Sequence, residues 1–295
     1  MQICVCVKQT PDSSSVYIDP ISGQVDVERF VQILNPADAC AVEAAVRLKE
    51  QVGGFIEVIT VGPADAEGTL RAALALGANR ATRLWHTQAS EWGPFTVSTV
   101  LAAYIQQQLP QPDLILCGDT ASDWSSGIVG PAMAERLHLP QVTSVSRLDL
   151  LPASAEDIEL TLLVTRKLER GYRERLGAHL PLLITVTSDL NEPRYPSLPA
   201  HIAALRANIS VENPLPLLSQ SIQEEAEETV LLEMHTPRPR ARHVPTPDSH
   251  HSAFERIGEI IMGGATGRQT RLVEGTNEEL AQVLVNFLRE KGFVE

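Results

Sequence analysis

The chain has 295 residues, of which 43% are hydrophobic, and this favours a globular protein with one large core or a core and a smaller lobe. Its formal net charge is -13, from 24 Lys and Arg against 37 Asp and Glu, so we expect no nucleic-acid partner, because phosphate neutralisation dominates such binding. All four cysteines lie in apolar segments, and no apolar run approaches the ~18 residues of a membrane span. We therefore expect a cytoplasmic protein without disulfide bonds that is not embedded in a membrane.

Strand-like and helix-like segments alternate through the first 120 residues. Apolar, β-rich runs predict buried strands at residues 2–7, 55–61, 81–85 and 113–117. Helical spacing of apolar residues predicts helices at residues 39–50, around Leu70, Ala73 and Leu74 with Gly77 as the C-cap, and at residues 96–108. This alternation predicts an α/β fold with a doubly wound, mostly parallel sheet, in which ligands lie beyond the carboxyl ends of the strands.

Two features join the first strand to the first helix. Residues 9–34 are polar and rich in turn-forming residues, which predicts a long connection that carries a small hairpin. The following Asn35-Pro36-Ala37-Asp38 opens a helix, for which Asp38 is expected to be the N-cap. This helix start is expected to face the same edge of the sheet as the loop that follows residue 117.

That loop is the strongest candidate for a binding site. Residues 113–117 are expected to form a buried strand, and a hydroxyl-rich segment leads from them to a helix that starts near Pro131. Backbone N–H groups and the hydroxyls of Thr120, Ser125 and Ser126 can donate to an anion there, while Gly127 allows close approach. A phosphate fits this chemistry, although most junctions of this kind in α/β sheets bind nothing.

After residue 140 the pattern changes. Residues 142–150, 158–165 and 182–187 are β-rich with no long helix between them, so we expect antiparallel additions to the sheet. A proline-stiffened segment at residues 190–199 is expected to run over the surface.

The rest of the chain has the composition of an arm. Residues 212–243 mix acidic runs with Pro-Arg repeats and are expected to lie outside the core. A helix is predicted at residues 277–291, with a stripe of Leu280, Val283, Leu284 and Leu288 that needs a partner surface, and another subunit is a candidate. We accordingly divide the chain into a core at residues 1–190, a partner-recognition loop and extended arm at 191–245, and a C-terminal arm with a helix at 246–295.

No metal site is expected. Cys4 and Cys6 lie two residues apart on one predicted strand, and His250 is followed by His251. Neither pair has further ligands at metal-binding spacing, so both are interpreted as structural or surface residues. No side chain has the pattern of a nucleophile with an adjacent base, which fits a protein whose chemistry is supplied by a cofactor.

Several segments resemble the β subunit of electron transfer flavoproteins. They are VCVKQTPD, NPADACAVEAAVRLKE, VGPADAEGTLRAALALGANRA, DLILCGDTASD and LNEPRYPSLP, which occur in the family's order over residues 1 to about 200. The resemblance implies a core like that of the adenine nucleotide alpha-hydrolase fold and a C-terminal arm that clasps a flavin-carrying α subunit. It also implies an electron carrier between acyl-CoA-type dehydrogenases and a membrane or ferredoxin acceptor, with FAD in the heterodimer.

The resemblance assigns site residues as well. The positions that match the family's adenine-nucleotide site are Cys6, Val7, Lys8, Asn35, Asp38, Val61, Gly118, Asp119, Asp123, Trp124, Ser125, Ser126, Gly127, Ile128 and Val129. Docking of an acyl-CoA dehydrogenase-like redox partner is expected at Leu198, Tyr195 and Arg194.

The family has two branches that these motifs do not separate. Ordinary members hold AMP in the β subunit, whereas electron-bifurcating members hold a second FAD there and oxidise NADH, which would make the protein an oxidoreductase. Residues 123–127 are similar to the bifurcating and nitrogen-fixation-like branches, but Ile128 replaces their usual Gln. Lys167 stands where many relatives have an acidic residue, which puts the usual charge pairing with redox partners in doubt.

A lower alternative is a nucleotide-binding enzyme of the same general fold that activates a substrate with ATP. Such an enzyme needs a glycine-rich phosphate loop after the first strand. Residues 8–13, Lys-Gln-Thr-Pro-Asp-Ser, contain no glycine. The sequence therefore argues against this alternative.

Overall fold

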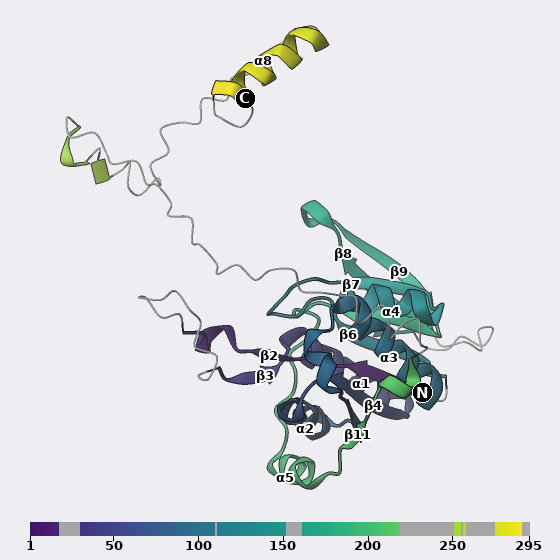
Figure 1. Ribbon diagram of the computed structural model, residues 1–295. Helices are drawn as coiled ribbons and strands as arrows, with labels where there is room; N and C mark the ends of the chain where they lie inside the picture. Colours follow the sequence, from purple (N-terminus) through teal and green to yellow (C-terminus); the bar gives the residue numbers. More distant parts are fainter. Residues whose placement is uncertain are drawn as a thin grey trace. The chain divides into compact units, whose positions relative to one another are not determined.

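The computed structural model describes residues 1–17, 30–109, 111–151, 161–218, 251–254, 256–257 and 275–290 (Figure 1). The chain separates into two compact units, Met1–Thr236 and Pro237–Glu295. Among the described helices, none is both long enough and apolar enough to cross a membrane.

A nine-stranded sheet organises the first unit, in the order β11-β5-β4-β1-β6-β10-β7-β8-β9. All neighbours from β11 to β7 are parallel, and β7, β8 and β9 are joined antiparallel. The strands are β1 Gln2–Cys6, β4 Phe55–Val61, β5 Arg80–Leu84, β6 Leu114–Gly118, β7 Gln141–Leu150, β8 Thr161–Lys167, β9 Arg173–His179, β10 Leu182–Val186 and β11 Ser210–Glu212. The predicted α/β class with a mostly parallel sheet is confirmed.

Helices cover both faces of this sheet, and the alternation of side chains along β1 shows how. Ile3 and Val5 belong to one core with residues of helices α1 and α2, while Cys4 and Cys6 belong to a second core with residues of α3 and α4. Successive strand residues point to opposite faces, so both faces of β1 are buried. The α-helices that the structure describes in this unit are α1 Pro36–Val52, α2 Glu67–Leu76, α3 Pro94–Gln108, α4 Val129–Leu137 and α5 Leu198–Arg206.

The predicted hairpin between the first strand and the first helix is present at its base. Strands β2 Gln9–Pro11 and β3 Gln32–Leu34 pair antiparallel, and residues 18–29 lie outside the described residues. Helix α2 ends as predicted, because Gly77 adopts φ +129° and its N–H donates to the carbonyls of Ala73 and Leu74.

The prediction for the later strands was wrong in one respect. Strands β7 and β10 are parallel members of the sheet, and β10 lies between β6 and β7, so the antiparallel additions are β8 and β9. All of β10 is buried, which is typical of an interior parallel strand. Strand β8 begins at Thr161, and residues 158–160 lie outside the described residues.

The predicted arm begins against the core. Residues 212–218 end β11 and form a short 3-10 turn, Leu215–Leu217, after which Leu218 is buried in the same core as α3. The expectation that residues from 212 onward lie outside the core was therefore wrong for Leu215, Leu217 and Leu218, which bury apolar surface there. Residues 219–250 lie outside the described residues.

The second unit contains helix α8, Asn277–Glu290, close to the predicted 277–291. Leu280, Val283 and Leu284 of its apolar stripe are exposed within the chain, and Leu288 is partly exposed.

Candidate functional site

The carboxylate of Asp38 ties two strand ends together. Its Oδ1 accepts the backbone N–H of Gly118 at 2.7 Å, and its Oδ2 accepts the backbone N–H of Lys8 at 2.8 Å. Lys8 follows β1 and Gly118 ends β6, so Asp38 joins the carboxyl ends of adjacent strands. The N-cap prediction for Asp38 was wrong: α1 begins at Pro36, and Asp38 lies inside the first turn, where the helix dipole favours a negative charge.

Gly118 has to be a glycine for this contact to form. A Cβ at this position would lie 2.5 Å from Oδ1 of Asp38 and 2.8 Å from Cβ of Ala37. Such distances are well inside van der Waals contact, so any side chain would push β6 away from α1.

Asn35, directly before α1, holds the loop that follows β6. Its Nδ2 donates to the carbonyl of Thr120 at 3.0 Å, and its Oδ1 accepts the N–H of Ser122 at 3.2 Å. Its own backbone N–H donates to the carbonyl of Lys8 at 3.0 Å. Since Asn35 is 2% exposed, these bonds are shielded from water and fix the loop to the helix start.

Residues 122–126 of this loop are exposed to solvent, and the chain then enters α4. Ser125 and Gly127 have positive φ angles of 49° and 64°, and Trp124 is 77% exposed. Within the described part of the chain, the backbone N–H groups of Ser126 and Gly127 have no hydrogen-bond acceptor. Helix α4 begins at Val129, two residues before the predicted start at Pro131. The N–H groups of Ser126 and Gly127 therefore lie close to the positive end of this helix.

One ion pair joins two segments of this site at its surface. The ammonium group of Lys8 donates to Oδ2 of Asp123, which joins the segment after β1 to the loop after β6. The Lys8 side chain is 45% exposed and that of Asp123 19%. The pair is accessible enough to exchange partners with an incoming anion.

The predicted nucleotide residues thus differ in what they can do. Most of them lie at one edge of the sheet: Lys8, Asn35, Asp38, Gly118, Asp119, Asp123 and the segment from Trp124 to Val129. Val61 ends β4 at the same edge. Asp38 has both carboxylate oxygens occupied by backbone N–H groups, so it supports the site and is not free to contact a ligand. Cys6 is buried and its Sγ lies 3.9 Å from Sδ of Met133, in the core beneath the site.

Two carboxyl groups of the site have shifted pKa values. Burial raises the pKa of Asp38 to about 7, against the opposing effect of the Gly118 and Lys8 N–H groups. Burial also raises the pKa of Asp119 above its ordinary value, while Thr120 acts in the opposite direction. With a pKa of about 7, Asp38 carries less than a full negative charge near neutral pH, which favours an anionic ligand nearby.

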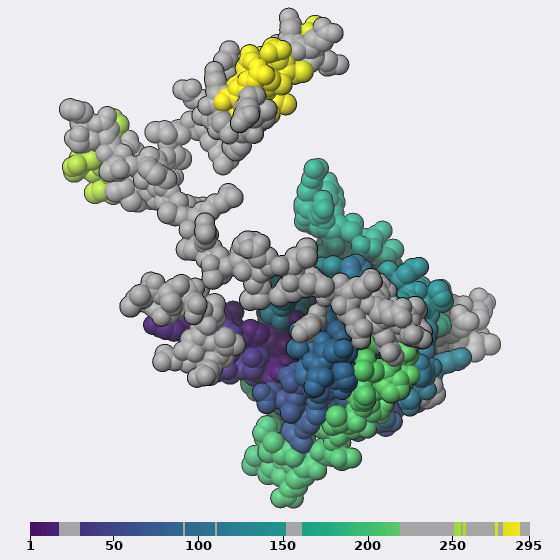
Figure 2. Space-filling view, viewed as in Figure 1, coloured from purple at the N-terminus to yellow at the C-terminus, as the bar shows by residue number. Residues whose placement is uncertain are grey.

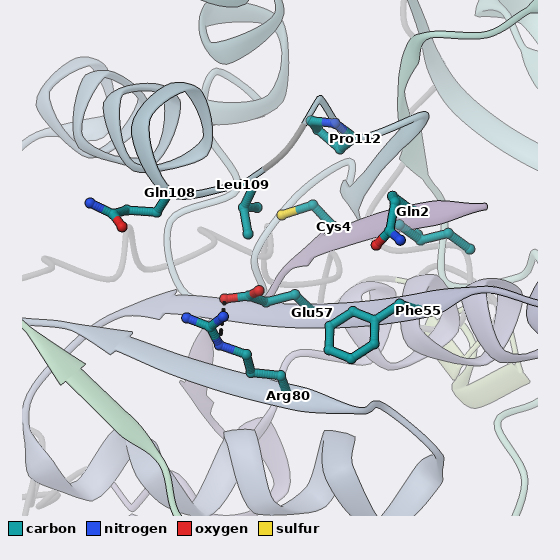
Figure 3. A pocket seen from close by; sticks show the side chains of 9 residues that line it. Gln2, Cys4, Phe55, Glu57, Arg80, Gln108, Leu109 and Pro112 are labelled. Carbon is teal, nitrogen blue, oxygen red and sulfur yellow. Dashed lines mark ion pairs between the residues drawn. The ribbon is translucent and has the colours of Figure 1, made fainter.

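A cavity of about 180 Å³ lies elsewhere, at the amino ends of β1 and β4 (Figure 3). Figure 3 shows Glu57 and Arg80 pointing toward one another beside this cavity. Nε of Arg80 and Oε1 of Glu57 are 3.4 Å apart. Oε1 of Glu57 also accepts the hydroxyls of Tyr104 and Thr82 at 2.9 and 3.0 Å. Glu57, Thr82 and Tyr104 are buried and hydrogen-bonded to one another, and they lie at the opposite end of the strands from the candidate site.

The predicted docking residues lie at the start of α5, a helix that packs beside α2 and forms part of the surface (Figure 2). Tyr195 is 98% exposed, and Leu198, the first residue of α5, is 71% exposed. Ile202 and Leu205 share the helix face of Leu198 and are exposed too, which sequence inspection missed although their spacing is helical. Arg194 instead turns inward to two glutamates of α1.

Lys167 also has a partner within the chain. Its ammonium group lies 2.7 Å from Oδ2 of Asp189, and this contact lowers the pKa of the Asp189 carboxyl. The positive charge of Lys167, at a position expected to be acidic in many relatives, is therefore balanced by Asp189 within the subunit.

Comparisons with known proteins agree on one family. A family model described as the electron transfer flavoprotein domain matches residues 24–215. The chain is 40% identical to the electron transfer flavoprotein subunit beta of Thermoanaerobacterium thermosaccharolyticum, over 67% of this chain and 72% of that protein. It is 37% identical to subunit CarD of the caffeyl-CoA reductase-Etf complex of Acetobacterium woodii, over 72% of this chain and 78% of that protein.

A further relative is similar over a longer stretch. Protein FixA of Azotobacter vinelandii is 30% identical to the chain, over 89% of this chain and 93% of the relative. The family model covers well over half of the chain, and four of the five segments that carried the resemblance lie within the matched residues. The chain therefore belongs to the electron transfer flavoprotein family, as a protein similar to its β subunits.

Proposed function

We propose that the chain is the β subunit of a heterodimeric electron transfer flavoprotein and holds an adenine nucleotide at the junction of β1, α1, β4 and the loop after β6. The observation that carries this is the arrangement around Asp38 and Asn35. These two buried side chains from one helix start fix both the segment after β1 and the loop after β6. A junction held this firmly presents a preformed cradle.

The cradle suits the phosphate end of a nucleotide. The unpaired N–H groups of Ser126 and Gly127 lie at the positive end of α4, and the Lys8 ammonium is within reach of the same loop. Gly127 adopts φ +64°, and a Cβ there would have no atom closer than 3.5 Å, so its backbone is open to close approach. The exposed indole of Trp124 can stack against a ring system.

The second part of the proposal is electron transfer with two partners. A flavin-carrying α subunit supplies the redox group, and an acyl-CoA dehydrogenase-like protein docks at Tyr195 and Leu198. Electrons then pass to a membrane-bound or ferredoxin acceptor. We propose a cytoplasmic location, which fits the four buried, free thiols.

A specific observation favours a second candidate, in which the β subunit holds a second FAD and the complex bifurcates electrons from NADH. The match to Azotobacter vinelandii FixA covers 89% of this chain, including part of the C-terminal region, whereas the match to the subunit beta of Thermoanaerobacterium covers 67%. This similarity supports membership of the FixA-like branch.

A cofactor count separates the two candidates. The chain is co-expressed with the α subunit, the heterodimer is denatured with acid, and the released AMP and FAD are quantified against protein. One AMP with one FAD per heterodimer supports the ordinary carrier, and two FAD support the bifurcating form. Absence of any adenine nucleotide beyond the flavin of the α subunit would contradict the proposed site.

A further inference from the structure

Arg194 is held by two carboxylates of helix α1. Its Nε and Nη2 donate to Glu43 at 2.9 and 3.2 Å, and its Nη1 and Nη2 donate to Glu50 at 2.5 and 3.0 Å. The backbone N–H of Arg194 also donates to Glu43 at 3.2 Å. Bidentate contact with both partners fixes the direction of the guanidinium group as well as its position.

The two glutamates differ in exposure but both stay ionised. Glu43 is 2% exposed; burial opposes its ionisation, yet the hydrogen bonds from Arg194 and Arg47 outweigh burial and lower its pKa. The hydrogen bond from Arg194 lowers the pKa of the exposed Glu50. The Arg194 cation is therefore compensated within the subunit and has no need of a charged group on a partner.

Helix α1 also holds the backbone that precedes Arg194. Asn191 Nδ2 donates to the carbonyl of Cys40 at 3.0 Å, and Arg47 Nη2 donates to the carbonyl of Glu192 at 3.1 Å. On the far side, the Ser197 hydroxyl accepts the N–H of Ala200 and caps α5. The exposed Tyr195 and Leu198 thus lie on a short span that is fixed at both ends and stiffened by prolines 193, 196 and 199.

We propose that Arg194 is a positioning residue for docking of the redox partner, and this inference rests on the proposed docking role of Leu198. Its contacts with Glu43 and Glu50 set the place from which Tyr195 and Leu198 project, and Arg194 itself does not contact the partner. A span that is ordered before docking loses little conformational entropy on binding. If the contacts of Arg194 are lost, the span becomes more mobile, and the conformational entropy lost on docking increases.

The test uses the full heterodimer with an acyl-CoA dehydrogenase of the same organism as electron donor. The variants are Arg194→Lys, which keeps the charge but loses the bidentate geometry, and Glu50→Gln, which weakens the contact at an exposed site. Both are expected to raise the KM for the dehydrogenase about tenfold with kcat unchanged. The matched control is Arg147→Ala, which removes an exposed Arg147–Asp149 pair on β7 and is expected to leave KM unchanged.

A further readout separates positioning from direct contact. Hydrogen exchange of the backbone amides of residues 191–198, apart from the prolines, is expected to become faster in both variants of the heterodimer without its redox partner. A raised KM with unchanged exchange would overturn the positioning role and assign Arg194 to the interface.

The parallel variant Leu198→Ala tests the docking role itself. If Leu198→Ala raises KM while Arg194→Lys and Glu50→Gln do not, docking stands and the positioning role is overturned. If Leu198→Ala leaves KM unchanged, the docking proposal fails and this inference fails with it, whereas nucleotide content measured on the same samples still reports on the nucleotide site.

Discussion

At the scale of single residues, Asp38 makes stability depend on pH. Burial raises its pKa in the folded protein to about 7 from an ordinary value of 3.8. The folded state therefore binds a proton more readily than the unfolded state, and the contribution of Asp38 to the free energy of unfolding falls as pH rises from about 4 to about 7.

The variant Asp38→Asn removes this titration. Asparagine can accept only one of the two N–H bonds, which lowers stability by about 1–3 kcal/mol independently of pH. From about pH 5 to about pH 8, the free energy of unfolding of the wild type is expected to fall relative to that of the variant, by up to about 3 kcal/mol. Urea unfolding of both proteins at the two pH values measures this. A wild type that gains stability relative to the variant as pH rises would show that the N–H groups outweigh burial.

Gly118 gives a second prediction at this scale. The variant Gly118→Ala is expected to lower the free energy of unfolding by about 1–3 kcal/mol, because the new methyl group displaces Asp38. Its matched control is Gly68→Ala in α2, where a Cβ meets no atom within 4 Å and helix propensity favours alanine. Thermal melting compares the two, and equal melting temperatures would contradict the close contact at Gly118.

At the scale of elements, the exposed face of α5 is the clearest functional surface. Leu198, Ile202 and Leu205 form an apolar stripe on a helix that Arg71 fixes by donating to the carbonyls of Ala204, Leu205 and Ala207. An exposed leucine on a preordered helix start can act as a binding anchor of about 2 kcal/mol.

Variants of this stripe test its role. Leu198→Ala is expected to raise the KM for the dehydrogenase about thirtyfold and Leu205→Ala by a smaller factor, without a change in melting temperature. The matched control is Phe95→Ala, an exposed apolar residue of α3, which packs on the other face of the sheet. A Leu198→Ala protein that melts several degrees earlier and docks normally would show that Leu198 serves only the fold.

Some strands could be predicted from the sequence and others could not. Strand β4 was predicted with its observed bounds, because its apolar run ends in glycines on both sides. Strand β9 was missed, since its Arg-Glu-Arg-Leu sequence has little β propensity and its pairing with β8 decides its conformation. The position of β10 between β6 and β7 was also missed, because the order of strands in a sheet depends on contacts between residues that are distant in sequence.

The same limit applied to the candidate site. Its segments were correctly expected at one edge of the sheet, because parallel strands end together. The role of Asp38 was not predictable, because its partner Gly118 lies 80 residues away and only the fold brings the two together. The inward turn of Arg194 likewise depends on Glu43 and Glu50, 151 and 144 residues earlier in the chain.

At the scale of the whole molecule, helix α8 predicts a partner. Its exposed Leu280, Val283 and Leu284 form an apolar stripe within the chain. We expect the chain to copurify with its α subunit, and we expect the Leu284→Asp variant to reduce recovery of the heterodimer several-fold while leaving the melting temperature of the nucleotide-binding core unchanged. Pull-down with a tagged α subunit measures this, and full recovery would place the contact elsewhere.

The proposal that the junction beyond β1, β4 and β6 holds an adenine nucleotide is tested by the nucleotide content of a loop variant. In the double variant Ser126→Glu and Gly127→Glu, two carboxylates replace the small residues whose N–H groups face the proposed phosphate. Acid release and chromatography of the purified heterodimer are expected to show loss of the β-subunit nucleotide, with the α-subunit flavin and the fold retained. Full nucleotide occupancy in this variant would show that the nucleotide is not held by the loop after β6.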